Sequence, residues 1–186
     1  MPHQGKDRLA LQVGDRDHTL GSKDAPITLV EYGDYECPYC KAAHAVLKKV
    51  LKELGDKVLF VFRHLPISTV HPNAKTAAEA AEAAASQGKF WEMHDILFEN
   101  QDSLDIDSLK RYATALNMDI RQFEKELSGH VHSQKVREDF ISGVRSGANG
   151  TPTFFINGKR YDGPITVDAL IKALEDELKR VLTHKE

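Results

Sequence analysis

Two cysteines, Cys37 and Cys40, are the residues of this chain whose type and spacing are best suited to chemistry. They are the only cysteines among the 186 residues, and Pro38 and Tyr39 lie between them. Two thiols at this spacing can close a small disulfide within one helical turn, and can therefore accept or donate two electrons. The motif predicts thiol–disulfide redox chemistry, carried by the protein's own dithiol with no other cofactor.

The position of the pair predicts a different role for each sulfur. An apolar run at 27–32 predicts a strand before the motif, and helical spacing predicts a helix at 41–54 after it. Where a helix begins, unpaired N–H groups and the helix dipole favour a thiolate, here at Cys37. We therefore expect Cys37 to be the exposed, attacking sulfur and Cys40 to be the more buried sulfur that resolves the mixed disulfide.

Three carboxylates lie close to the cysteines in the sequence. Glu31 interrupts the apolar strand, where a charge is costly unless it has a function. A buried carboxyl beneath the disulfide could relay the proton of Cys40, whereas a position on a solvated strand edge would give Glu31 no such role. Asp34 and Glu36 bring negative charge close to Cys37, which would partly oppose the thiolate, to an extent that depends on their geometry.

A proline far along the chain is a further candidate. Pro152 follows Gly150-Thr151 and leads into an apolar run, which fits either a cis peptide or an ordinary strand-initiating proline. A cis bond there would leave the backbone groups of Thr151 able to pair with an extended substrate peptide. Both interpretations stay open on the residues alone.

A metal site is the alternative interpretation of the cysteine pair. Structural zinc normally takes four protein ligands, and the sequence has no second CxxC motif. His44 could supply a third ligand, although its helical spacing favours a surface or packing position. We predict no metal ligands, and a metal-binding module that uses Cys37, Cys40 and His44 stays the alternative.

The composition and the charges exclude several classes of protein. The 25 basic and 28 acidic residues give a formal net charge of −3 and are spread along the chain, so no basic patch favours nucleic acid. No apolar stretch approaches the roughly 20 residues that span a bilayer. The polar opening at residues 1–8 lacks the apolar segment of a secretory signal. We expect a cytoplasmic protein, or a periplasmic one if a leader was removed.

The order of the expected elements predicts an α/β fold with a helical insertion. A second apolar strand at 58–63 completes a strand–helix–strand unit, and Leu9–Val13 could add a short edge strand. Residues 71–146 then read as entirely helical. Two short strands around Asn157-Gly158 predict a hairpin, and an amphipathic helix at 166–182 ends the chain.

The helical stretch also carries recognisable start signals. His71-Pro72 is expected to open its first helix, with the proline in the first turn. Asp107 and Asp119 are each expected to cap a later helix, because a short acidic side chain accepts from the N–H groups of the first turn.

These motifs together resemble the DsbA-like thioredoxin family of bacterial thiol:disulfide oxidoreductases. The resemblance covers nearly the whole chain from about Val13, and four stretches carry it: 32–40 with the CPYC motif, 62–66, 88–94 and 150–158. It implies a single domain over 1–186, with a thioredoxin fold (βαβ…ββα) interrupted by an inserted all-helical subdomain. The thioredoxin-fold parts are expected at 13–66 and 147–186, and the helical insertion at 67–146.

The resemblance also implies roles for individual residues. Cys37 is the nucleophile, Cys40 the resolving cysteine and Glu31 a buried proton relay. Pro152 is a cis proline, and the substrate-contacting positions are Thr151, Pro38 and Tyr39. The partners implied are protein or peptide thiols and disulfides, together with a redox partner that recycles the pair.

Two features of the sequence leave the direction of electron flow open. The best-known oxidases of this family carry histidine at the position of Tyr39 and are usually exported. CPYC is also similar to the motif of glutaredoxins, which are about half this length and lack the insertion. A glutathione-linked, glutaredoxin-like reductase is therefore a second alternative.

Overall fold

The structure, a computed structural model, describes residues 7–184, so most of the N-terminal opening used to predict localisation lies outside the described residues. The chain forms two compact units. We call residues 7–32, 42–63 and 142–184 the sheet unit, and Gly33–Lys41 with His64–Ile141 the helical unit. The domain boundaries expected from the sequence, at 67 and 146, stay a prediction.

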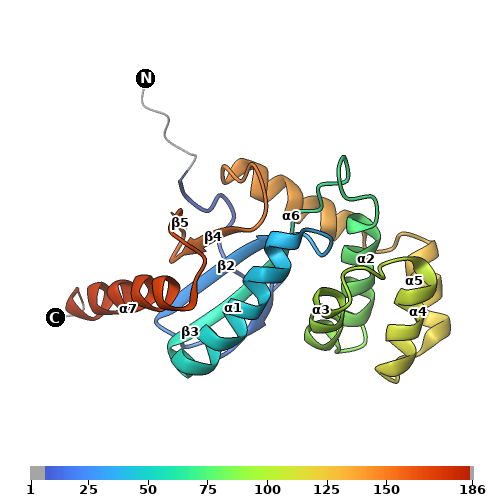
Figure 1. Ribbon diagram of the computed structural model, residues 1–186, viewed down its shortest axis with the longest axis horizontal. Coiled ribbons are helices and arrows are strands. Elements are labelled where there is room, and N and C mark those ends of the chain that lie inside the picture. Colours follow the sequence, from blue (N-terminus) through green and yellow to red (C-terminus); the bar gives the residue numbers. More distant parts are fainter. Residues whose placement is uncertain (1–6, 185–186) are drawn as a thin grey trace. The chain divides into compact units, whose positions relative to one another are not determined.

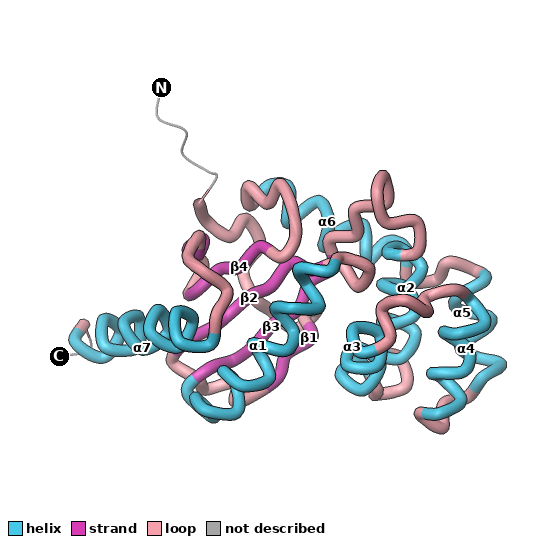
Figure 2. Tube along the Cα trace, in the orientation of Figure 1, coloured by secondary structure: helices cyan, strands magenta, loops and turns pink. Residues whose placement is uncertain are grey.

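The sheet unit is built on a five-stranded sheet with the strand order β1-β3-β2-β4-β5, shown in magenta in Figure 2. The strands are β1 (His18–Leu20), β2 (Ile27–Gly33), β3 (Val58–His64), β4 (Thr153–Ile156) and β5 (Lys159–Tyr161). All seven residues of β3 are buried, and so are six of the seven in β2. This burial explains why both strands have nearly continuous apolar sequences instead of alternating ones.

Two long helices complete the sheet unit, and both are labelled in Figure 1. In α1 (Pro38–Leu54) the buried residues Ala43, Leu47, Val50 and Leu54 recur at helical spacing. The last helix, α7 (Val167–Thr183), begins at the cap Thr166, whose side chain accepts from the Ala169 N–H. The predicted hairpin between β4 and β5 is confirmed, and Asn157 and Gly158 both have positive φ (47° and 79°), as a type I′ turn requires.

The helical unit packs its helices around an alanine-rich one. Helix α2 (Ala74–Ala85) has nine buried residues, seven of them alanine, and contacts α3 (Phe90–Glu99), α4 (Ile106–Ala115) and α5 (Ile120–Ser128). The small side chains let neighbouring helices approach closely, so a helix that looks weakly amphipathic can be buried on most sides. Helix α6 (Ser133–Arg145) follows, and the prediction that this part of the chain is helical is confirmed.

The edge strand predicted at Leu9–Val13 is wrong. The edge strand beside β3 is β1, paired antiparallel with residues 60–62, and residues 9–13 form no strand. Next to that segment Arg8 forms an isolated bridge with Lys159, and the Leu9 N–H donates to the Gly158 carbonyl. The reason lies in the carbonyl groups of Leu11 and Gln12, which accept hydrogen bonds from the Arg63 guanidinium instead of from a neighbouring strand.

Two predicted helix starts also need correction. The N-cap of α4 is Asp105, which has an extended backbone and accepts from the Ser108 N–H, whereas Asp107 lies inside the first turn. Both the N-cap and the first turn of a helix favour an acidic residue, so the sequence alone does not show whether Asp105 or Asp107 is the cap. Helix α2 begins at Ala74, so Pro72 lies before the helix and not in its first turn, where the sequence predicts it. The cap at Asp119 is confirmed, because its side chain accepts from the Gln122 N–H.

Candidate active site

The cysteine pair lies where β2 turns into α1. Cys37 directly precedes the helix, in the N-cap position, and Cys40 falls in its first turn. The Cys37 carbonyl accepts from the N–H groups of Cys40 and Lys41, both at 3.1 Å, and the Cys37 N–H donates to the Asp34 carbonyl at 3.1 Å. The N-cap side chain is the one best placed to meet the unpaired N–H groups of a first turn, so this position favours a thiolate at Cys37.

The expectation that Cys37 is exposed is wrong, although the order of burial is as predicted. Cys37 is 4% exposed and Cys40 is fully buried, whereas Tyr39 is 75% exposed. Residues three apart share one face of a helix, so Cys37 lies on the same inward face as Cys40 while position 39 turns outward. Pro38 is exposed as well, so the two solvent-facing residues of the motif are Pro38 and Tyr39, which lie between the cysteines.

The two carboxylates before Cys37 are bound by the loop that follows β3. The Asp34 carboxylate accepts from the N–H groups of Glu36 and Ile67, both at 2.8 Å, and bonds the His71 ring at 2.8 Å. The Glu36 carboxylate accepts from the Asn73 N–H at 2.7 Å. Both charges are thus held by donors within the helical unit, and these hydrogen bonds fix the turn that carries Cys37 to residues 67–73.

A third residue of the turn, Tyr35, anchors it in the helical core. Its hydroxyl lies 2.9 Å from Nδ1 of His94, and its ring packs at 4.9 Å from that of Phe98, measured between centroids. Both partners belong to α3, so the turn is fixed by side chains far away in the sequence. None of these partners was predicted, because a buried histidine in a helical run looks like any other core residue.

The remaining predicted residues lie in the sheet unit. Glu31 is 1% exposed in the middle of β2, opposite Phe154 of β4, so the solvated-edge interpretation of this carboxyl is wrong. The Thr151-Pro152 peptide is cis, as the resemblance implied, and immediately precedes β4. Glu31 thus lies on β2, and Thr151 and Pro152 lie just before the neighbouring strand β4. The proton-relay role of Glu31 stays a prediction, and His44, on α1, is nearly buried.

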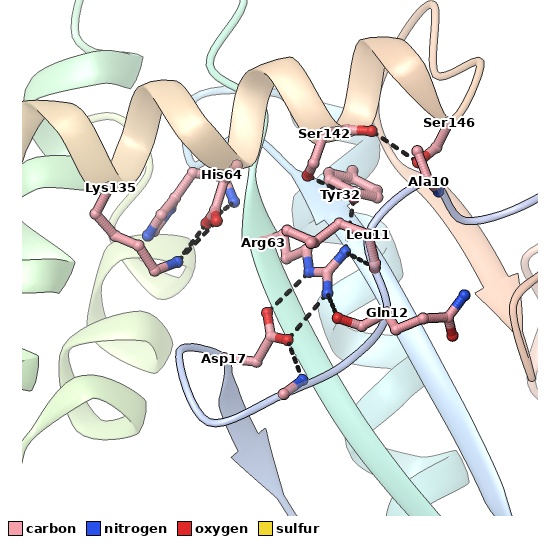
Figure 3. Close-up of polar contacts among 12 residues, drawn as sticks. Ala10, Leu11, Gln12, Asp17, Tyr32, Arg63, His64, Lys135, Ser142 and Ser146 are labelled. Atoms are coloured by element: carbon pink, nitrogen blue, oxygen red, sulfur yellow. Dashed lines mark hydrogen bonds and ion pairs between the residues drawn. The ribbon is translucent and has the colours of Figure 1, made fainter.

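Arg63 ties the N-terminal segment of the sheet unit to β2, as Figure 3 shows. Its guanidinium donates to both carboxylate oxygens of Asp17 at 2.8 and 2.9 Å, and to the Tyr32 hydroxyl at 2.9 Å. Burial alone would lower the pKa of Arg63, but the contacts with Asp17 and Tyr32 outweigh it, and the pKa lies above the ordinary arginine value. The buried arginine therefore stays charged.

The next residue, His64, belongs to a buried ionic cluster of the helical unit. The ring Nε2 of His64 lies 2.7 Å from the Glu82 carboxylate, and the backbone N–H of His64 donates to the Asp139 carboxylate at 3.1 Å. The Lys135 ammonium contacts both carboxylate oxygens of Asp139 at 2.8 Å. Although His64, Glu82 and Asp139 could together ligate a metal ion, the Lys135 ammonium already supplies a cation. We interpret this cluster as structural.

Comparison with known proteins agrees with this fold. The Thioredoxin family model matches residues 14–176. BdbD from Bacillus subtilis is 26% identical with a TM-score of 0.82, and the alignment covers 93% of this chain and 99% of that one. Wolbachia pipientis alpha-DsbA1, at 22% identity, has the same fold with a TM-score of 0.82 over 96% and 98% of the two chains.

The curated relatives are longer proteins. Na(+)/H(+) antiporter NhaA 3 of Salinispora tropica is 46% identical over 160 residues, or 86% of this chain. Na(+)/H(+) antiporter NhaA 1 of Mycolicibacterium vanbaalenii is 47% identical over 165 residues. The chain spans only about a quarter of the length of these relatives. Among residues 7–184, none of the helices has the length and apolar character needed to cross a membrane. Because the Thioredoxin family model matches residues 14–176, the chain belongs to the thioredoxin family, and its likeness to BdbD shows that it has the DsbA-type fold.

Proposed function

We propose that this protein is a thiol:disulfide oxidoreductase that exchanges a Cys37–Cys40 dithiol or disulfide with cysteines of protein substrates. The observation that carries the proposal is the placement of Cys37 at the N-cap of α1, with Cys40 in the first turn. A thiolate there is stabilised by the helix end, and the second thiol is close enough to resolve a mixed disulfide. The full-length likeness to BdbD supports the same chemistry.

In the reducing direction, the Cys37 thiolate attacks one sulfur of a substrate disulfide. A mixed disulfide forms, and the other substrate sulfur leaves as a thiolate that takes up a proton. Cys40 then loses its proton, for which Glu31 is the proposed acceptor, and attacks the sulfur of Cys37. The Cys37–Cys40 disulfide closes, the second substrate thiol is released, and two electrons have passed to the substrate. The oxidising direction is the reverse sequence.

Trapping with single-cysteine variants tests the assignment of the two sulfurs. Cys40→Ser should accumulate mixed disulfides with a reduced and partly unfolded protein client under mild oxidation, because no second thiol resolves them. Cys37→Ser is the matched control and should trap little, since its remaining thiol is fully buried. Equal trapping by the two variants would contradict the assignment of Cys37 as the nucleophile.

Two measurements separate this proposal from its alternatives. Rapid reduction of the Cys37–Cys40 disulfide by glutathione alone would favour a glutathione-linked reductase, whereas slow reduction favours exchange with protein thiols. Stoichiometric zinc or copper in protein purified without added metal would favour a metal-binding module. The reduction potential, measured against a glutathione buffer, gives the direction of electron flow.

A further inference from the structure

The backbone around Cys37 is held by a side chain from the helical insertion. Gln101 lies in the loop between α3 and α4, and its Nε2 donates to the Tyr35 carbonyl at 2.9 Å and to the Cys37 carbonyl at 2.8 Å. A primary amide nitrogen carries two hydrogens, so one side chain satisfies both carbonyls at once. The two acceptors flank Glu36, which leaves the last turn before the nucleophile little freedom to rotate.

The identity of residue 38 makes the second of these bonds more important. Because Pro38 has no N–H, the peptide between Cys37 and Pro38 can be oriented by hydrogen bonds only through the Cys37 carbonyl. Two of those bonds come from the N–H groups of Cys40 and Lys41 within α1 itself. A third comes from Gln101, 64 residues further along the chain, and this donor is a side chain from outside the helix.

We propose that Gln101 is a positioning residue for the reactive thiol. It holds the Cys37–Pro38 peptide in the orientation that turns the positive end of α1, and the Tyr39 N–H in particular, toward the Cys37 sulfur. A thiolate gains more from that alignment than a thiol does, because a charged acceptor makes the stronger hydrogen bonds. Gln101 thereby favours the thiolate and sets part of the reactivity of Cys37. This inference rests on the proposed function only in taking Cys37 as the reactive thiol.

The effect of removing Gln101 has a predictable sign. Gln101→Met keeps the length of the side chain but removes both donors, so the turn loosens and the thiolate loses part of its stabilisation. If about half of one hydrogen bond is transmitted to the sulfur, the midpoint of the thiolate titration rises by about half a pH unit. Gln101→Glu should raise the midpoint further, because an ionised carboxylate brings negative charge against two carbonyl oxygens and close to the thiolate.

Gln87 offers a matched control in the same unit. Its side chain also bonds backbone, donating to the Asp119 carbonyl at 3.1 Å and accepting from the Asp119 N–H at 2.7 Å. These two bonds tie the end of α2 to the start of α5, away from the turn at 33–41. Gln87→Met should lower the melting temperature about as much as Gln101→Met does, but leave the thiolate midpoint unchanged.

The experiment uses the full chain in a Cys40→Ser background, where Cys37 is the only thiol. The ultraviolet absorbance of the thiolate is followed against pH, with circular dichroism to confirm that each variant is folded. A raised midpoint in Gln101→Met, with no change in Gln87→Met, supports the inference. A parent thiol that is clearly acidic, with the same midpoint in Gln101→Met and Gln101→Glu, overturns the inference and leaves the proposed function intact. A parent thiol no more acidic than free cysteine overturns both.

Discussion

The pair formed by Arg63 and Asp17 should carry a large share of the stability of the sheet unit. Both side chains are 0% exposed, and the guanidinium makes a bidentate contact with the carboxylate at 2.8 and 2.9 Å. Asp17→Asn keeps the size of the side chain but removes the charge, so a buried guanidinium is left without its counter-ion. Removing one partner of a buried pair costs about 3–5 kcal/mol.

That cost is large compared with the total stability of a domain, which is typically about 5–15 kcal/mol. For a chain of this size, each kcal/mol shifts the melting temperature by about 2–4 °C, so Asp17→Asn should melt about 6–20 °C below the wild type. The assay is urea unfolding at neutral pH together with a thermal scan. The exposed pair formed by Lys172 and Asp176 provides the control, and Asp176→Asn should change the midpoint very little because solvent screens that pair.

The reasoning also predicts the behaviour of the double variant. Arg63→Leu with Asp17→Leu removes both charges together, so it should cost less than the sum of the two single substitutions. The account of the pair is refuted if Asp17→Asn is as stable as Asp176→Asn, or if the two single effects simply add.

Three further predictions concern the proton relay, a helix start and the response to acid. Glu31→Gln should slow disulfide exchange in an insulin-reduction assay without lowering the melting temperature, and an unchanged rate would remove its proposed role. Asp105→Ala should lower the melting temperature measurably while Asp107→Ala should not, because only Asp105 caps α4; equal losses would contradict that cap. Burial would raise the pKa of Glu126, but hydrogen bonds with His132 and other neighbours outweigh it and hold the pKa below the usual 4.5. Because the pKa of Glu126 is lower in the folded state than in the unfolded state, this carboxylate contributes its full stability above the unfolded-state pKa. The contribution is lost as the pH falls through the folded-state pKa. The advantage of wild type over Glu126→Gln should therefore shrink as the pH falls below about 4.5, as acid-dependent urea unfolding can measure.

The sequence predicts the elements well where a single local signal decides. The central strands at 27–32 and 58–63 are continuous apolar runs, and the structure extends each by one residue. The Asn157-Gly158 turn is equally local, since both residues tolerate the positive φ that the hairpin needs. The two cysteines and their placement at a helix start also follow directly from spacing.

The sequence fails where a distant side chain decides. Residues 9–13 have the apolar character of an edge strand, but the Arg63 guanidinium donates hydrogen bonds to two backbone carbonyls of this segment. The sequence suggests that Cys37 is exposed at a helix start, but Cys37 lies on the same side as the buried Cys40 and is itself buried. Gln101 stands in a polar loop with no feature that distinguishes it from its neighbours. Each of these outcomes depends on a contact between residues far apart in the sequence, or on burial, which no local pattern reports.

The positioning of Cys37 therefore depends on the helical insertion as much as on the strand and helix that flank it. Four side chains of the turn and its surroundings, those of Asp34, Glu36, Tyr35 and Gln101, make hydrogen bonds between residues 33–41 and residues 64–141. A helix N-terminus by itself stabilises a thiolate only if the preceding residue keeps its orientation. Since Pro38 removes one of the groups that could fix that orientation, the insertion supplies the missing restraint. On this argument, substitutions far from the cysteines but at these contacts should change thiol acidity before they change the fold.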